Sequence, residues 1–191
     1  ESLTFGIEYS ESSKDDSDLF SVGLANVIKT KKNDDLPTKS SLNQKSSDFF
    51  GEIVFNPSKH LNFEYDFSID NNLDKANYSL LKAGLTINNF ITSFEFLEED
   101  NFIGNKSYIT NKTKYNLNNN NSITFNGTKN LDKGISEYYN LIYEYQNDCL
   151  SAAVEYNKTF YSDGDLKPQK NIFFMIKILP FVDTNNSPTS F

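Results

Sequence analysis

The side chains that could carry acid–base chemistry in this chain are carboxylates at alternating positions. Glu64 could pair with Asp66 along one segment, and Glu144 could pair with Glu155 on a neighbouring segment. Such a pair could act as general acid and general base, or as acid and nucleophile in glycoside hydrolysis. Rows of acids and amides also suit the water-filled interior of a barrel, and this interpretation is favoured. The residues expected to face such a lumen are Asn62, Glu64, Asp66, Glu144 and Glu155.

Histidine and cysteine each occur once. His60 lies beside a predicted turn at 56–57 without a nearby partner of catalytic type, so we expect a solvated turn residue rather than a metal ligand. Cys149 follows a tight turn at 147–148, which would lie at the periplasmic rim of a membrane barrel. A single thiol in that oxidising compartment suggests a partner outside the segment, and a buried, inert cysteine is the alternative. No catalytic residue, metal or cofactor is expected.

The composition argues against nucleic acid as a partner and against helices as membrane spans. The chain has 191 residues, a formal net charge of -8 and 18 lysines without arginine, so it offers no basic stripe for a nucleic acid. It has no run of about eighteen apolar residues, which a membrane-spanning helix requires. Aromatic residues make up 15% of a chain whose mean hydropathy is -0.56. Strands with one apolar and one polar side produce this combination.

Alternation of apolar and polar residues predicts an all-β chain. The clearest segment is 61–70, which alternates strictly, and 3–9 repeats the pattern. No stretch has the apolar spacing of an amphipathic helix between capping residues. Many segments are near the about nine to eleven residues with which a tilted strand crosses a bilayer. The predicted strands are 3–9, 19–31, 48–55, 61–70, 78–87, 90–97, 108–117, 122–129, 136–146, 150–162 and 171–181.

The connections between these segments predict an orientation in the membrane. Long connections such as 32–46 and 163–170 alternate with tight ones such as 88–89 and 147–148, and the first connection, 11–17, is an exception because it is longer than its place in the alternation predicts. Outer loops and periplasmic turns alternate in this way in transmembrane barrels. If the strands are counted from the tight turns, the last strand runs toward the periplasm. Residues 182–191 are then expected to form a periplasmic C-terminal tail.

The predicted fold is an antiparallel transmembrane β-barrel segment of about eleven long strands. It covers residues 1–181 and belongs to a larger barrel in a bacterial outer membrane. Asn126-Gly127 is a strong hairpin signal, but a turn there would leave too short a strand, so one continuous strand is expected. The alternative is a soluble β-sandwich or small ligand-binding barrel, whose strands average about five or six residues.

Part of the chain resembles a known family. In the stretch 143–161 a strand ends in Asp148-Cys149, and the next strand carries tyrosine and lysine. A proline-containing segment at 165–168 leads to the final strand, and 47–51 follows a long loop. In these features the chain is similar to the C-terminal part of the LPS-assembly protein family LptD, most specifically over 143–181.

The resemblance implies a very large barrel that follows a periplasmic domain and holds an LptE-like plug lipoprotein. Lipopolysaccharide would arrive from periplasmic Lpt bridge proteins, through the upstream domain, and leave sideways through a lateral gate between the first and last strands. Cysteines of the family bond to cysteines of the N-terminal region. Only Cys149 matches these cysteines here, so at most one disulfide, to a cysteine outside this chain, is expected. One side of the gate would be Asn171, Ile172, Phe173, Phe174, Met175, Ile176, Lys177 and Ile178.

Two other functions stay open at this point. The first is a general porin or outer-membrane transporter, in which acids of the lumen set ion preference. The second is a barrel hydrolase that uses a pair of these acids. The sequence upstream of residue 1 would distinguish the three functions. A periplasmic domain with cysteines would indicate lipopolysaccharide assembly, and a signal peptide followed directly by strands would indicate a porin. A hydrolase would need a Ser-His pair there. On the resemblance, the gate's other strand would lie outside this chain. The barrel could not close without that strand, because unpaired strand edges are costly in lipid.

Overall fold

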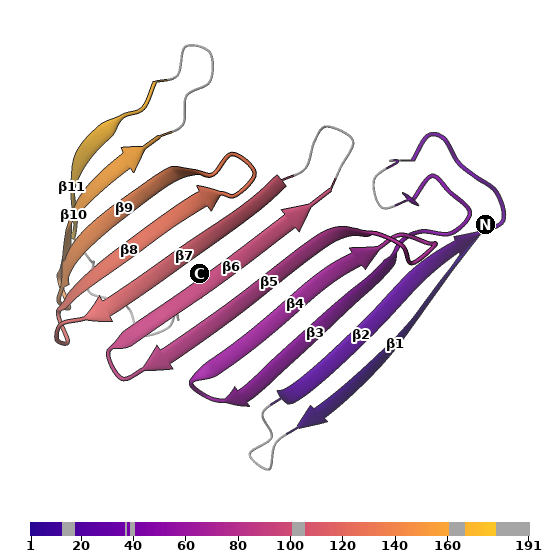
Figure 1. The fold of residues 1–191 in the computed structure, drawn as a ribbon. Helices are drawn as coiled ribbons and strands as arrows, with labels where there is room; N and C mark the ends of the chain where they lie inside the picture. Colours follow the sequence, from indigo (N-terminus) through magenta and orange to yellow (C-terminus); the bar gives the residue numbers. More distant parts are fainter. Residues whose placement is uncertain (13–17, 37, 39–40, 101–105, 161–166, 179–191) are drawn as a thin grey trace.

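The computed structural model describes residues 1–12, 18–36, 38, 41–100, 106–160 and 167–178. Within these residues eleven strands form one antiparallel sheet, in which each strand pairs with the next strand of the chain (Figure 1). No helix in this part of the chain is long and apolar enough to cross a membrane. The strands are β1 (Ser2–Ser12), β2 (Asp18–Lys29), β3 (Phe49–Ser58), β4 (Leu61–Ile69), β5 (Ala76–Ile87), β6 (Phe90–Glu99), β7 (Lys106–Asn116), β8 (Asn121–Asn130), β9 (Ile135–Gln146), β10 (Leu150–Thr159) and β11 (Lys170–Ile178).

The all-β prediction and all eleven predicted strands are confirmed. Their lengths, between 9 and 12 residues, also match the expected long strands. Asn126-Gly127 lies inside β8, as expected. β3 runs three residues past its predicted end and includes Pro57, because a bulge interrupts its pairing with β4 beyond Phe55. A proline is tolerated at this bulge, because the interrupted pairing does not require the backbone N–H that proline lacks.

The sheet is open, with β1 and β11 at its two edges. A closed barrel is therefore not formed by the described residues. In Figure 1 the turns that follow β3, β5, β7 and β9, of two to four residues, lie along the lower end of the sheet, and the connections that follow β2, β4 and β8, of four to 19 residues, lie along the upper end. We call these the short-turn end and the long-connection end. The predicted strand residues 179–181 and the tail 182–191 lie outside the described residues.

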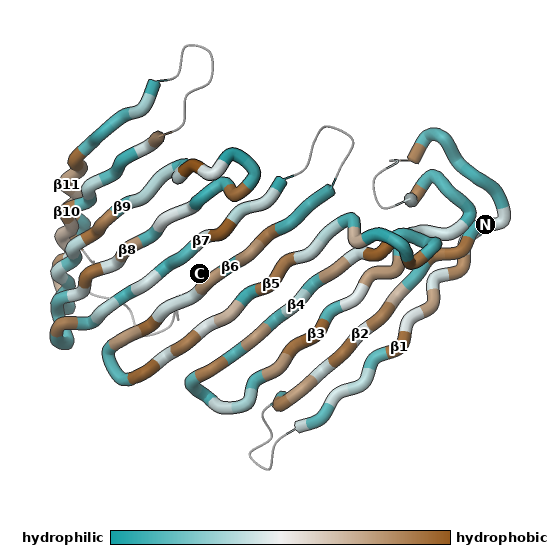
Figure 2. The backbone as a smooth tube through the Cα atoms, viewed as in Figure 1, coloured by the Kyte–Doolittle hydropathy of each residue, from teal (hydrophilic) through white to brown (hydrophobic). Residues whose placement is uncertain are grey.

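Cross-strand register separates the side chains into two faces. Residues directly opposite each other in neighbouring strands lie on the same face, and successive residues of a strand alternate between faces. Figure 2 shows this alternation of hydrophobic and hydrophilic residues along individual strands. We call one side the apolar face; its members include Ile7, Leu24, Ile53, Tyr65, Leu81, Phe94, Ile109, Phe125, Leu141, Val154 and Phe174.

The described residues form no second layer over the apolar face. Among the described residues no hydrophobic side chain is buried, and Leu81, Leu141 and Phe174 are 42%, 47% and 77% exposed. The chain exposes 13973 Å² in total, whereas a globular protein of 21.8 kDa would expose about 9,300 Å². A soluble sandwich would bury this face, so the arrangement does not match that alternative.

The opposite side of the sheet, which we call the polar face, carries the side chains that alternate along each strand with those of the apolar face. Figure 1 shows β3 to β6 almost face-on and β10 and β11 almost edge-on, so the sheet is curved. Ser68, Glu99, Ser122 and Asn130 of the polar face are buried although the sheet has one layer.

Gly51 of β3 gives the ring of Phe67 a place to lie on the apolar face. The two residues are directly opposite each other in register, and a Cβ at position 51 would overlap the Phe67 ring. We expect Gly51→Ala to cost about 1–3 kcal/mol of unfolding free energy, because the ring must leave its position. Gly23→Ala is the matched control, since nothing lies within 4 Å of its added Cβ. Urea unfolding of both variants checks this, and equal midpoints would contradict it.

Candidate functional site

A charged cluster lies at the middle of the polar face, where β3, β4 and β5 run side by side. Lys82 Nζ lies 2.5 Å from Glu64 Oε1 and 3.7 Å from Asp66 Oδ2. Glu52 is directly opposite Asp66, and carboxylate oxygens of Glu52, Glu64 and Asp66 all lie within 4.8 Å of one another. Glu95 is opposite Lys82 on β6. One cation thus faces several carboxylates, and the cluster gives the polar face a local negative charge.

This cluster is suited to attracting cations rather than to acid–base catalysis. Three carboxylate oxygens at this spacing are the kind of ligand that hard divalent cations prefer. Lys82 already occupies the centre of the group, and the side chains of Glu64 and Asp66 are 33% and 30% exposed. Both carboxylates face the same ammonium group, and none of the described contacts sets one of them apart as a proton donor.

The structure places all five predicted lumen residues on the polar face but does not pair all of the acids. Glu144 accepts a hydrogen bond from Ser151 Oγ at 3.1 Å, and Glu155 accepts one from Asn140 Nδ2 at 3.0 Å. Glu144 and Glu155 therefore each take a neutral partner. They are not directly opposite each other, because Glu144 pairs with Ala153, two residues before Glu155. Asn62 fits where Gly84 leaves room for its amide.

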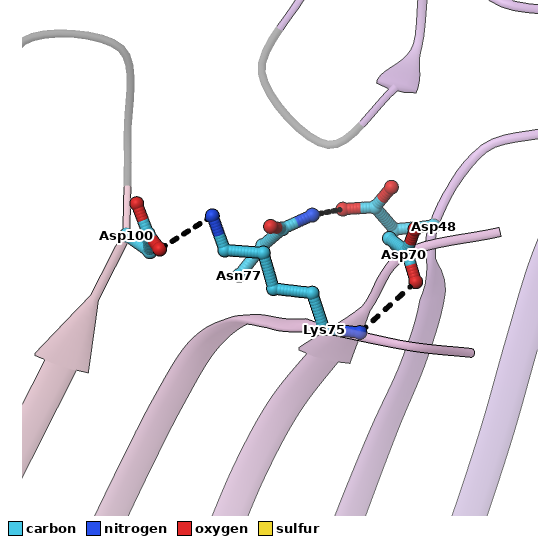
Figure 3. Close-up of polar contacts among 5 residues, drawn as sticks. All are labelled: Asp48, Asp70, Lys75, Asn77 and Asp100. Carbon is cyan, nitrogen blue, oxygen red and sulfur yellow. Dashed lines mark hydrogen bonds and ion pairs between the residues drawn. The ribbon is translucent and has the colours of Figure 1, made fainter. Parts of the chain in front are cut away.

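A second polar network, which the sequence did not predict, lies at the long-connection end. Asp48 is 0% exposed, and its Oδ2 accepts hydrogen bonds from Ser68 Oγ at 3.0 Å and from Asn77 Nδ2 at 2.8 Å (Figure 3). Its Oδ1 has no hydrogen-bond partner among the described residues. Asn26 Nδ2 donates to the carbonyl of Ser47 at 2.8 Å. These bonds fasten the end of the connection between β2 and β3 to β4 and β5.

The neighbouring turn between β4 and β5 is organised by Asp70. Its carboxylate accepts hydrogen bonds from the backbone N–H groups of Asp74 at 2.9 Å and Lys75 at 3.3 Å, while Lys75 Nζ lies 2.5 Å from Asp100 Oδ2 (Figure 3). Desolvation raises the pKa of Asp70, but hydrogen bonds from Asp74, Lys75 and Asn72 outweigh it, so the pKa lies below the ordinary value.

This lowered pKa predicts how the turn responds to acid. The stabilisation by Asp70 is fully present above the ordinary carboxyl value of 3.8, and it is lost as the pH falls through the lower value of the folded protein. We expect the amide protons of Asp74 and Lys75 to lose protection from hydrogen exchange only below about pH 3.8. Asp70→Asn should remove this pH step, and a step that persists in the variant would contradict the assignment.

Cys149 is exposed and free, so the alternative of a buried cysteine is wrong. It lies inside the turn between β9 and β10, which has three residues rather than the predicted two. Asn147 Oδ1 accepts hydrogen bonds from the backbone N–H groups of Cys149 at 3.0 Å and Leu150 at 2.8 Å. The thiol is thus held at the short-turn end, where a second protein segment could reach it.

The disulfide from Cys149 to a cysteine outside this chain stays a prediction. We expect the intact protein to change mobility on reduction in gel electrophoresis, and Cys149→Ser to lack the oxidised species. A stability change is not expected, because the side chain is exposed. Identical migration of the oxidised wild-type protein and the variant would exclude the bond.

The predicted gate residues 171–178 all lie on β11, at an edge of the sheet. This strand pairs with β10 alone in the described sheet, and Ile172, Ile176 and Ile178 are 61%, 76% and 78% exposed. β1 forms the other edge, and its residues are exposed throughout. The molecule therefore presents two strands that are available for pairing.

His60 lies in the turn between β3 and β4, as the sequence predicts. Its backbone N–H donates to Ser58 Oγ at 3.3 Å. Within the described part of the chain, no carboxylate or hydroxyl group is hydrogen-bonded to its imidazole. The position therefore matches the expected solvated turn residue.

A group of polar side chains on the apolar face satisfies its own hydrogen bonds. Thr92 Oγ1 and Thr113 Oγ1 lie 2.7 Å apart, and Asn111 Nδ2 donates to Thr92 Oγ1 at 3.2 Å and to the carbonyl of Ser93 at 3.1 Å. Thr113 Oγ1 lies 3.1 Å from Asn111 Oδ1. Polar groups that bond to one another in this way can lie against surroundings that offer no hydrogen bonds.

No protein-family model matches the chain, and comparison with curated proteins finds no significant relative. The class of structure rests on the fold itself: an open, all-β, antiparallel sheet of eleven long strands with one polar and one apolar face.

Proposed function

We propose that this chain forms part of the wall of a β-barrel in a bacterial outer membrane and serves transport or assembly rather than catalysis. The observation that carries the proposal is the wide apolar face without a covering layer. Lipid hydrocarbon covers such a face in transmembrane barrels, and the lumen is polar. The acid–lysine cluster around Lys82 and the buried amide and hydroxyl groups of the polar face suit such a lumen.

The open edges fit the same proposal. In a bilayer each unpaired N–H and C=O group costs several kcal/mol, so β1 and β11 must pair with further strands. The wall would therefore be completed by strands outside the eleven described here. The long-connection end would lie at the cell surface and the short-turn end in the periplasm.

Within this class we propose insertion of lipopolysaccharide into the outer leaflet through a lateral gate, of which β11 forms one side. The support is the resemblance of 143–181 to the LptD family, together with the edge position of β11. An LptE-like lipoprotein would occupy the lumen, and periplasmic Lpt bridge proteins would dock on an upstream domain. Depletion of the intact protein in its host should reduce lipopolysaccharide at the cell surface. Unchanged surface lipopolysaccharide would exclude this role.

A general porin is the second candidate, and the acidic cluster of Glu52, Glu64 and Asp66 favours it. Rings of acids in a pore select cations. Planar-bilayer recording of the intact protein separates the candidates, because a plugged assembly barrel conducts little while a porin conducts steadily and prefers cations.

The barrel proposal is tested by spin labels on neighbouring residues of one strand. Labels at Leu141 and Tyr143 should be shielded from a water-soluble relaxation agent and accessible to oxygen, and labels at Asn140 and Ile142 should show the reverse. Equal accessibility of both faces to the water-soluble agent would refute the membrane location.

A further inference from the structure

Two lysines lie opposite each other on the apolar face at the long-connection end. Lys158 of β10 pairs directly with Lys170 of β11, and Tyr139 of β9 lies on the other side of Lys158 in the same row. Like charges directly opposite each other destabilise a strand pair. Neither lysine has an ion pair with any residue that the structure describes. The repulsion is therefore uncompensated by a described carboxylate.

The ammonium group of Lys158 rests against aromatic rings. Its Nζ lies 4.1 Å from the centroid of the Phe160 ring and 5.7 Å from that of Tyr139. The Tyr139 ring in turn contacts Phe160 and Tyr156, with centroids 5.6 Å and 6.2 Å apart. Aromatic rings between an apolar surface and charged groups are typical of the headgroup level of a membrane.

The residues toward the middle of the same two strands are apolar. Val154 of β10 is opposite Phe174 of β11, and Tyr156 is opposite Ile172. Figure 2 shows β11 changing from hydrophilic at its start, beside the long connection, to hydrophobic further along. A molecule with a charged head and hydrocarbon chains would therefore meet lysines first and an apolar strip below them.

The charged side chains on the apolar face of β8 to β11 are all of one sign. The chain has 26 acidic residues and 18 lysines, yet among the described residues of β8 to β11 this face carries lysines, Lys129 included, and no acid. Glu137 of β9 bonds instead to Asn130 Nδ2 at 3.2 Å, on the polar face. A face with lysines alone is complementary to an anion.

We propose that Lys158 and Lys170 bind the phosphate group of an amphipathic lipid whose hydrocarbon chains lie along the apolar face of β10 and β11. The inference rests on the proposed membrane location and deepens it by naming the headgroup chemistry. A phosphate between the two ammonium groups accepts charge-assisted hydrogen bonds from both and removes their repulsion. A lipid is specified rather than free phosphate, because the apolar strip below the lysines adds hydrophobic contact that an inorganic ion cannot use.

The test uses the intact protein in phosphatidylcholine nanodiscs that contain diphosphoryl lipid A, with a photoreactive residue at position 172. The double variant Lys158→Gln, Lys170→Gln should need about 30-fold more lipid A for half-maximal crosslinking, because each lysine near a membrane surface contributes about a factor of five to six. Lys158→Arg with Lys170→Arg should retain capture. Lys112→Gln with Lys177→Gln, on the polar face, is the control for charge alone.

Three results would overturn the proposal. They are equal capture of fully dephosphorylated lipid A, displacement of the lipid by inorganic phosphate, and crosslinking to an acidic protein in place of lipid. If the protein inserts and its apolar face is shielded from water, these results remove the phosphate site and leave the barrel. If apolar-face positions are instead open to water-soluble reagents, the membrane location fails and the lipid site fails with it.

Discussion

Leu81→Lys is expected to destabilise the intact protein in a bilayer by about 2–4 kcal/mol, the usual cost of a lysine on the lipid side near the midplane of a barrel. Leu81 lies in the middle of β5 on the apolar face and is 42% exposed. In water such an exposed position would accept lysine at little cost. The size of the effect therefore reports directly on what surrounds this face.

Leu80→Lys is the matched control, since it makes the same substitution one position earlier on the opposite face. Leu80 is opposite Asp66 of β4 and is half-buried, so a lysine there faces a carboxylate and, in the proposed barrel, a wet lumen. We expect a change of less than about 1 kcal/mol. Urea unfolding in phosphatidylcholine vesicles measures both variants. A larger loss for Leu80→Lys than for Leu81→Lys would refute the membrane assignment.

Asp48→Ala is expected to lower the free energy of unfolding by about 2–4 kcal/mol, because a buried donor that loses its acceptor costs about 1–3 kcal/mol and a half-buried one costs less. The donors are Ser68 Oγ and Asn77 Nδ2, which belong to β4 and to the start of β5. The connection between β2 and β3 should then detach from the sheet. Cleavage by trypsin after Lys45 should become faster. In the folded protein the carbonyl of Lys45 accepts a hydrogen bond from the N–H of Lys29 at 2.7 Å, which holds this residue against β2.

Two variants control for this result. Asp48→Asn keeps an acceptor oxygen in place and should retain most of the stability. Asp34→Ala removes an exposed carboxylate from the same connection and should change neither unfolding nor cleavage. If Asp48→Ala unfolds at the same urea concentration as Asp34→Ala, the network has no stabilising role.

The strands and their faces could be predicted because the signal is local. In β4 each apolar residue from Leu61 to Ile69 alternates with a polar one, and the period alone defines the strand and its two sides. The predicted lumen residues Asn62, Glu64 and Asp66 follow from the same alternation. The end of β3 was misplaced because Pro57 usually marks a turn, whereas a bulge accommodates it here.

The polar networks could not be predicted because they depend on register between distant residues. Asp48 meets Asn77 across 29 positions of sequence, and nothing in the local pattern distinguishes it from other acids at strand starts. The pairing of Lys158 with Lys170 likewise depends on the register of β10 with β11. For the same reason the sequence could not show that Glu144 and Glu155, a possible acid pair, each bond to a neutral neighbour.

The pairing of every strand with its sequence neighbour has a consequence for how the sheet forms. Each hairpin closes a short stretch of chain, so the entropy lost per added strand is small and the search for partners stays local. The sheet can grow by successive hairpins, and no distant segment has to be found before the next strand is added. If β1 and β11 pair with further strands, as we propose, that pairing is the slow event, and kinetic traps are expected there rather than within the sheet.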